Sequence, residues 1–175
     1  RKAALKPFKE LYGLNATVIS AVDLIKGIGT LAKMEVLDVP GATGYIDTNF
    51  DGKAAAAVDA FKRGQDLVYI HVEAPDECGH RGEAANKVRA IELIDEKILG
   101  PVRKALEEMG DYRILVLPDH PTPLAIKTHS SDPVPYLIYD SREKQAGVSR
   151  FTEANARATG SYEPNASILM KNLIK

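Results

Sequence analysis

This sequence has one cysteine, almost no net charge and no long apolar run. The single cysteine, Cys78, excludes an internal disulfide and favours a reducing compartment. A net charge of −1 argues against the basic patches that nucleic-acid-binding surfaces carry. No apolar run approaches the roughly 18 residues of a membrane-spanning helix, and no signal-peptide pattern opens the chain. We therefore expect a cytoplasmic protein with no nucleic-acid partner and no membrane partner.

The composition that remains is that of a globular domain. The chain has 175 residues, of which 45% are hydrophobic and 27% are charged, enough for one domain with a buried core. It begins with Arg1 and Lys2, without an initiator methionine and without a capping residue before a helix-compatible segment. We interpret the chain as a piece of a longer protein.

Apolar periodicity predicts alternating strands and helices. Strand patterns cover residues 15–22, 35–39, 66–73, 112–117 and 134–139, and helix patterns cover residues 1–12, 24–33, 52–63, 83–109, 152–158 and 166–174. This order predicts an α/β fold with a mostly parallel sheet. The run 66–73 is apolar almost throughout, which predicts a strand covered on both faces. Pro101 predicts a kink or a break in the longest helix near Gly100.

Acidic and histidine residues follow two of these strands and recur in a later loop. Asp76 and His80 lie four residues apart after the third strand, Asp119 and His120 follow the fourth, and His129 comes nine residues later. Ligands of parallel sheets gather beyond the carboxyl ends of the strands, so we expect these side chains to meet there. Three imidazoles and two carboxylates suit Zn or Mn better than an oxygen-only Mg or Ca site.

Other residues have simpler interpretations that stay open. A lone Asp–His pair in a loop is usually solvated, and it is the presence of two pairs at two strand ends that favours a metal site. Cys78 reads as a small buried filler rather than a ligand or nucleophile. His71, inside the third strand pattern, reads as a core histidine. Lys26 could meet a phosphate near a helix N-terminus or could be a solvated lysine.

Four segments resemble the archaeal-type cofactor-independent phosphoglycerate mutases, a branch of the alkaline phosphatase superfamily of metalloenzymes. They are residues 19–29, 40–45, 72–80 and 115–123, and the likeness runs from about Leu11 to the tail. The resemblance implies a three-layer α/β sandwich with a mostly parallel central sheet, similar to alkaline phosphatase. It also implies that residues 1–175 are the C-terminal part of the metal-binding domain. The N-terminal part and an inserted substrate domain would be absent, which leaves the sandwich incomplete.

The same resemblance implies a glycolytic isomerase that interconverts 3-phosphoglycerate and 2-phosphoglycerate through a phosphoserine intermediate. Its cofactors would be two divalent ions, Mn or Zn, with Mg or Co as alternatives. Lys26 would contact the phosphate of this small phosphorylated metabolite. The metal ligands divide between the ions: one binds Asp76, His80 and His129, and the other binds Asp119 and His120.

The sequence departs from the family pattern in two ways. It has no N-terminal Asp-Gly metal motif, and none of its serines has the context of the nucleophile, so no catalytic residue is assigned here. We therefore expect the isolated chain to be inactive and, through exposed strand edges, to self-associate. Three alternatives remain: a phosphotransferase similar to homoserine kinase, a phosphate-ester hydrolase, and a non-catalytic module that binds metal or forms oligomers.

Overall fold

A computed structural model of the chain describes residues 4–143 and 145–175. The chain divides into two compact units, residues 1–105 and residues 106–175. The helix expected over residues 1–12 begins only at Phe8, as α1 (Phe8–Tyr12), and residues 1–3 lie outside the described part. Gly13 ends this helix in the left-handed conformation, with φ of 74°.

A three-stranded parallel sheet forms the centre of the first unit. Its strands are β1 (Ala16–Ile19), β2 (Glu35–Leu37) and β3 (Leu67–Ile70), in the order β2-β1-β3. All four residues of the central strand β1 are buried. Thr17 lies opposite Glu35 on one side and Val68 on the other. The predicted α/β fold with a mostly parallel sheet is confirmed.

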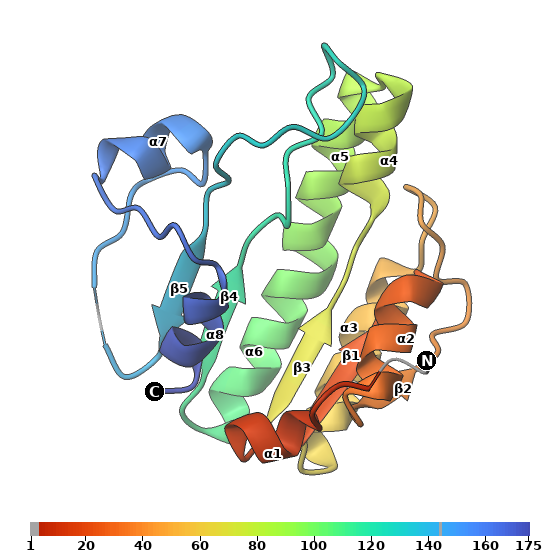
Figure 1. Ribbon diagram of the computed structural model, residues 1–175, viewed down its shortest axis with the longest axis vertical. Helices are drawn as coiled ribbons and strands as arrows, with labels where there is room; N and C mark the ends of the chain where they lie inside the picture. Colours follow the sequence, from red (N-terminus) through yellow and green to blue (C-terminus); the bar gives the residue numbers. More distant parts are fainter. Residues whose placement is uncertain (1–3, 144) are drawn as a thin grey trace. The chain divides into compact units, whose positions relative to one another are not determined.

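Helices cover both faces of this sheet. The connection from β1 to β2 contains α2 (Asp23–Leu31), and the connection from β2 to β3 contains α3 (Phe50–Lys62). Figure 1 shows α2 in front of the sheet and α3 behind it. Opposite faces are expected, because right-handed crossovers that proceed in opposite directions along a sheet place their helices on opposite sides. The carboxyl ends of the three strands therefore share one edge between two helical layers.

The third strand is shorter and less buried than its sequence predicts. Residues 66–73 suggested a strand covered on both faces, but β3 spans only Leu67–Ile70 and is half-buried. The Tyr69 side chain is 44% exposed. Within the order β2-β1-β3, β3 is an outer strand, whereas β1 has a neighbour on each side. The apolar pattern therefore predicted the strand correctly but overestimated how deeply it is buried.

A helix occupies the segment that follows β3, outside the helix patterns read from the sequence. This helix, α4 (Ala74–Arg81), has Pro75 in its first turn and ends at Gly82, whose φ is 71°. Proline at a helix start and a left-handed glycine just past its end are common termini. Asp76 and His80 thus lie on a helix and not on an irregular loop.

The long helical pattern 83–109 forms one continuous helical path with a change of pitch. It consists of α5 (Ala84–Ile94), the π-helix η1 (Asp95–Leu99) and α6 (Gly100–Met109). Of the kink or break expected near Gly100, the helix shows a local irregularity and no break: the Gly100 N–H reaches back to the carbonyl of Asp95. Pro101 has no N–H, and its ring would crowd the carbonyl four residues earlier. The wider π turn accommodates that ring without ending the helix.

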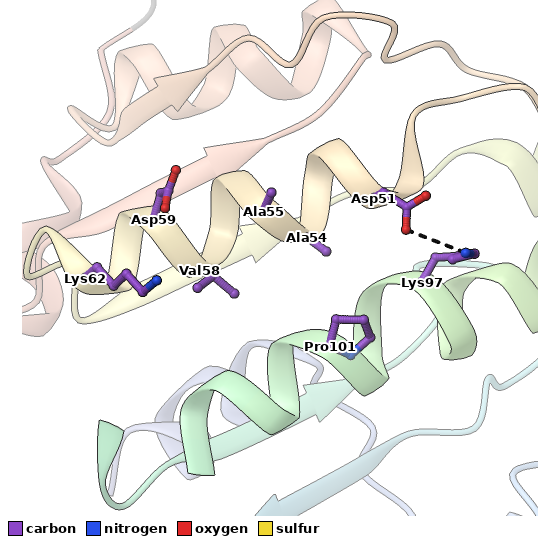
Figure 2. Close-up of a pocket in the computed structure, with 8 residues that line it drawn as sticks. All are labelled: Asp51, Ala54, Ala55, Val58, Asp59, Lys62, Lys97 and Pro101. Atoms are coloured by element: carbon purple, nitrogen blue, oxygen red, sulfur yellow. Dashed lines mark ion pairs between the residues drawn. The ribbon is translucent and has the colours of Figure 1, made fainter. Parts of the chain in front are cut away.

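A shallow groove of ≈ 340 Å³ runs along α3 in the first unit. Figure 2 shows its lining residues on α3, with Lys97 and Pro101 on the other side. Lys97 Nζ lies 3.8 Å from the Asp51 carboxylate across one end of it. None of the predicted metal ligands lines this groove, so it does not coincide with the expected site.

The second unit contains an antiparallel strand pair and two short helices. The strands are β4 (Arg113–Val116) and β5 (Leu137–Asp140), and the helices are α7 (Glu153–Ala158) and α8 (Ser167–Leu173). Strand β4 is half-buried, although its apolar sequence suggested a buried strand. Arg113 Nε lies 2.5 Å from the Asp140 carboxylate, and Arg113 Nη1 donates to the carbonyl of Leu173, which ties α8 to β4. No helix of the described residues is long and apolar enough to cross a membrane.

Candidate metal centre

The predicted ligand pair of the first unit lies on one face of α4. His80 Nε2 is 3.3 Å from Asp76 Oδ2, and both side chains are partly exposed. Residues four apart on a helix are neighbours, so the four-residue spacing in the sequence places both groups together. The prediction that these two side chains converge is confirmed, and a carboxylate oxygen next to an imidazole nitrogen is a donor pair suited to Zn or Mn.

Further carboxylates surround Asp76. Oxygens of Glu73, Asp76 and Glu77 lie within 4.8 Å of one another. The N–H groups of Asp76 and Glu77 both donate to the Glu73 carbonyl, which starts α4. Acidic side chains at a helix start are stabilised by its N-terminal partial charge. The first turn of α4 is therefore a concentrated negative region that a divalent cation would offset.

The predicted ligands of the second unit lie in the long connection between β4 and β5. His120 Nε2 is 3.6 Å from Asp119 Oδ2, and the Asp119 carboxylate also accepts the His120 main-chain N–H at 3.1 Å. The His120 Nδ1 atom lies 3.4 Å from the hydroxyl of Thr122, a residue that is buried. Adjacent residues in a regular strand would point to opposite faces. Here the strand has ended at Val116, and the turn brings both groups together.

His129 returns to the same place after the proline-rich loop. The ring centroids of His120 and His129 are 3.7 Å apart. The loop is closed by two main-chain hydrogen bonds, from Ser130 to Pro121 and from Lys127 to Pro123. Lys127 has a φ of 53°, the left-handed conformation that reverses the chain. The loop thus brings His129 to His120, whereas the family resemblance grouped His129 with Asp76 and His80.

Each compact unit therefore holds one cluster of potential ligands. Asp76 and His80 belong to the first unit, and Asp119, His120 and His129 belong to the second. Their division between two ions stays a prediction. Each cluster offers imidazole nitrogens and carboxylate oxygens, donors that fit a divalent transition metal.

Lys26, the predicted phosphate contact, lies at the same edge of the parallel sheet as α4. Its ammonium is 3.1 Å from the carboxylates of both Asp23 and Asp38. Hydrogen bonds to Asp23 and Asp38 raise the pKa of Lys26, so the side chain stays charged. The two partner carboxylates are largely exposed, and exposed ion pairs are weak. The contact of Lys26 with a phosphate stays a prediction.

His71 lies just beyond the end of β3 and is half-buried, whereas the sequence predicted a core histidine inside the third strand. Its Nδ1 atom lies 3.1 Å from the Ser20 hydroxyl, and the same hydroxyl accepts the N–H of Val22. The contact joins the carboxyl ends of β1 and β3.

Sequence reasoning overlooked Lys53, which lies beneath this edge of the sheet. The Lys53 side chain is buried, and its ammonium donates to the carbonyl of His71. Burial lowers the pKa of Lys53, and the nearby Glu73 carboxylate opposes that shift. A signal was present: Lys53 shares the i, i+4, i+7 face of α3 with the buried Ala57 and Ala60. A lysine on that face needs a buried partner.

Cys78 is buried on α4, as predicted for a filler residue. Burial raises the pKa of its thiol, and the nearby Glu83 carboxylate raises it further. A thiol of this kind is a poor nucleophile at neutral pH.

Comparison with known proteins gives this geometry a family. A family profile described as the metalloenzyme superfamily matches residues 1–174. The chain belongs to the metalloenzyme superfamily. Membership implies the use of a divalent metal, in agreement with the two ligand clusters of the described residues.

Curated relatives within this superfamily are named as phosphoglycerate mutases. A 2,3-bisphosphoglycerate-independent phosphoglycerate mutase of Methanosarcina acetivorans is 49% identical over 173 residues, covering 97% of this chain and 43% of the relative. The enzyme of the same name from Methanothrix thermoacetophila is 53% identical over 154 residues, which cover 87% of this chain and 39% of that relative. This metalloenzyme chain thus spans about two fifths of the length of the curated relatives that it matches.

Solved structures agree with the assignment of the fold. A cofactor-independent phosphoglycerate mutase from Thermoplasma acidophilum aligns with a TM-score of 0.72 and 26% identity, covering 98% of this chain and 39% of that one. A Pyrococcus horikoshii protein aligns with a TM-score of 0.80 and 32% identity, and the alignment covers 89% of this chain and 46% of that one. The resemblance to archaeal-type phosphoglycerate mutases stated from the sequence is confirmed.

Proposed function

We propose that this chain is the metal-binding portion of a cofactor-independent phosphoglycerate mutase, which interconverts 3-phosphoglycerate and 2-phosphoglycerate through a phosphoserine. The observation that carries the proposal is the Asp76–His80 pair on α4, at 3.3 Å, within a chain 49% identical to a relative of that name. Residues 1–175 would form the C-terminal part of the metal-binding domain.

The ligand assignment is the one that the family resemblance implies. Asp76, His80 and His129 would hold one ion, and Asp119 and His120 would hold the other. Two bound divalent ions would lower the pKa of a serine hydroxyl and offset charge on the phosphoryl oxygens. Manganese or zinc suits this mixture of imidazole and carboxylate donors.

Two further roles are phosphate binding, which we assign to Lys26, and nucleophilic attack, which we assign to a group outside this chain. Lys26 would bind the substrate phosphate by exchanging its exposed carboxylate partners for phosphoryl oxygens. Ser20 is held between Val22 and His71 and is buried, which leaves it unsuited to act as the nucleophile. We place the nucleophilic serine, the remaining ligands and the inserted substrate domain in the part of the relatives that this chain does not match.

A chimera tests this function. In it, the matched 173 residues of the Methanosarcina acetivorans relative are replaced by this chain. We expect metal-dependent conversion of 3-phosphoglycerate to 2-phosphoglycerate, and none from this chain alone. Asp76→Asn in the chimera should abolish conversion, whereas Asp59→Asn, an exposed carboxylate on α3, should not.

The same assay separates the alternatives. Phosphorylation of homoserine without mutase activity would identify the related phosphotransferase, and release of free phosphate from the substrate would identify a hydrolase. Metal binding with none of these reactions would indicate a non-catalytic module and would contradict the proposal.

A further inference from the structure

The loop between β2 and α3 contacts both ends of helix α4. We call residues 40–49 the 40–49 loop. At the start of α4, the backbone of Gly44 lies so close to Glu73 that a Cβ added to Gly44 would overlap the Glu73 carboxylate. Glu73 is the residue directly before α4. A Cβ there would require the Glu73 carboxylate, the flexible end of its side chain, to move.

At the other end of α4, Tyr45 is the contact. Its hydroxyl donates to the Glu83 carboxylate, and Asn86 Nδ2 donates to that carboxylate at 2.8 Å and to the Tyr45 oxygen at 3.2 Å. The guanidinium of Arg81 lies over the Tyr45 ring, 4.2 Å from its centroid. Arg81 and Glu83 flank Gly82, where α4 ends. One tyrosine therefore holds both sides of the turn between α4 and α5.

The 40–49 loop is itself braced by side chains. Thr43 Oγ1 donates to Asp47 at 2.6 Å, and the Thr43 N–H donates to the hydroxyl of the buried Thr48 at 2.9 Å. Asn49 Nδ2 donates to the Pro40 carbonyl at 2.9 Å and closes the base of the loop. Internal hydrogen bonds of this kind reduce the number of conformations open to the loop. It can therefore act as a fixed support.

Helix α4 needs such a support. It has only eight residues, and no side chain caps its N-terminus by a hydrogen bond. A helix of two turns is not stable by itself, and a metal site must hold its ligands to within roughly 0.5 Å. We propose that the 40–49 loop positions the Asp76–His80 pair for metal binding, with Gly44 and Tyr45 as positioning residues. This inference rests on the proposed function of that pair.

The decisive variant is Tyr45→Phe. It removes the hydroxyl that reaches Glu83 and keeps the ring under Arg81. Titration with Co²⁺ gives both an affinity and a visible absorption spectrum that reports the ligand geometry. We expect Co²⁺ affinity to fall on the order of 10-fold, as for other residues that orient metal ligands, with a changed spectrum. Tyr162→Phe, at an exposed tyrosine, is the matched control and should change neither quantity.

Gly44→Ala tests the other end of α4, with Gly147→Ala as its control because a Cβ at Gly147 meets nothing within 4 Å. We again expect weaker Co²⁺ binding in the first variant only. Far-UV circular dichroism and urea titration establish that each variant is folded. Unchanged affinity and spectrum in folded Tyr45→Phe and Gly44→Ala would overturn the positioning role alone. Failure of the unmodified chain to bind Co²⁺ would overturn the metal site, and this inference with it.

Discussion

The ammonium of Lys53 donates a hydrogen bond of 2.9 Å to the main-chain carbonyl of His71, just beyond the end of β3. Lys53 lies in the first turn of α3, and His71 in turn contacts Ser20 at the end of β1. One buried cation thus joins a helix to the carboxyl ends of two parallel strands. The segment that it holds leads directly into α4 and the Asp76–His80 pair.

Loss of this donor should destabilise the fold. Lys53→Met is expected to lower the free energy of unfolding by about 1–3 kcal/mol, because the hydrogen bond from the Lys53 ammonium to the His71 carbonyl would be lost. Urea unfolding followed by circular dichroism measures the change. Lys62→Met, at an exposed position of the same helix, is the control and should stay within about 0.5 kcal/mol of the unmodified chain. Equal stability of the two variants would contradict the role given to Lys53.

Two glycines of α2 should respond to alanine with opposite signs. A Cβ at Gly29 would lie 2.9 Å from Val18 Cγ2 and 3.2 Å from Val36 Cγ2, where the helix meets the sheet. Gly29→Ala is therefore expected to cost about 1–3 kcal/mol through overpacking. A Cβ at Gly27 meets nothing within 4 Å, so Gly27→Ala should add up to about 1 kcal/mol from helix propensity. Thermal unfolding of both variants tests the pair, and a stabilising Gly29→Ala would show that α2 is not held closely to β1.

Asp140 should make the second unit sensitive to acid. Hydrogen bonds from Arg142 and Arg113 hold the pKa of this carboxyl well below its ordinary value of 3.8. A lowered carboxyl pKa adds stability above the unfolded pKa, and this stability is lost as pH falls through the folded value. Asp140→Asn should therefore lower Tm by several degrees at pH 7, and the difference should narrow below about pH 4. A difference in Tm that is independent of pH would contradict this account.

Cys78 should be unreactive in the folded chain. Its side chain is buried, and burial raises the pKa of the thiol. We expect a thiol-specific disulfide reagent at pH 8 to react with Cys78 only after urea unfolding. Rapid reaction under native conditions, at the rate measured in urea, would show that α4 opens readily.

Local sequence patterns accounted for most elements but not for α4 or η1. The segment 74–81 has few apolar residues, so periodicity gave no helix there, although Pro75 and Gly82 mark both of its ends. Pro101 suggested a kink or a break, whereas the chain adopted a π turn that keeps α5 and α6 continuous. Neither difference depends on an apolar face. The ends of α4 are set by Pro75 and Gly82, and the π turn by the backbone hydrogen bonding next to Pro101.

The sequence by itself placed acidic and histidine residues directly after predicted strands, because the patterns that mark strands, loops and helices are local. It also placed Asp76 and His80 four residues apart, and the helix α4 makes residues at that spacing neighbours. Only the tertiary structure decided that His129 reaches His120, that Lys53 reaches His71, and that Tyr45 reaches Glu83. Those contacts join residues distant in the chain, and packing and loop closure select them without leaving a periodic pattern in the sequence.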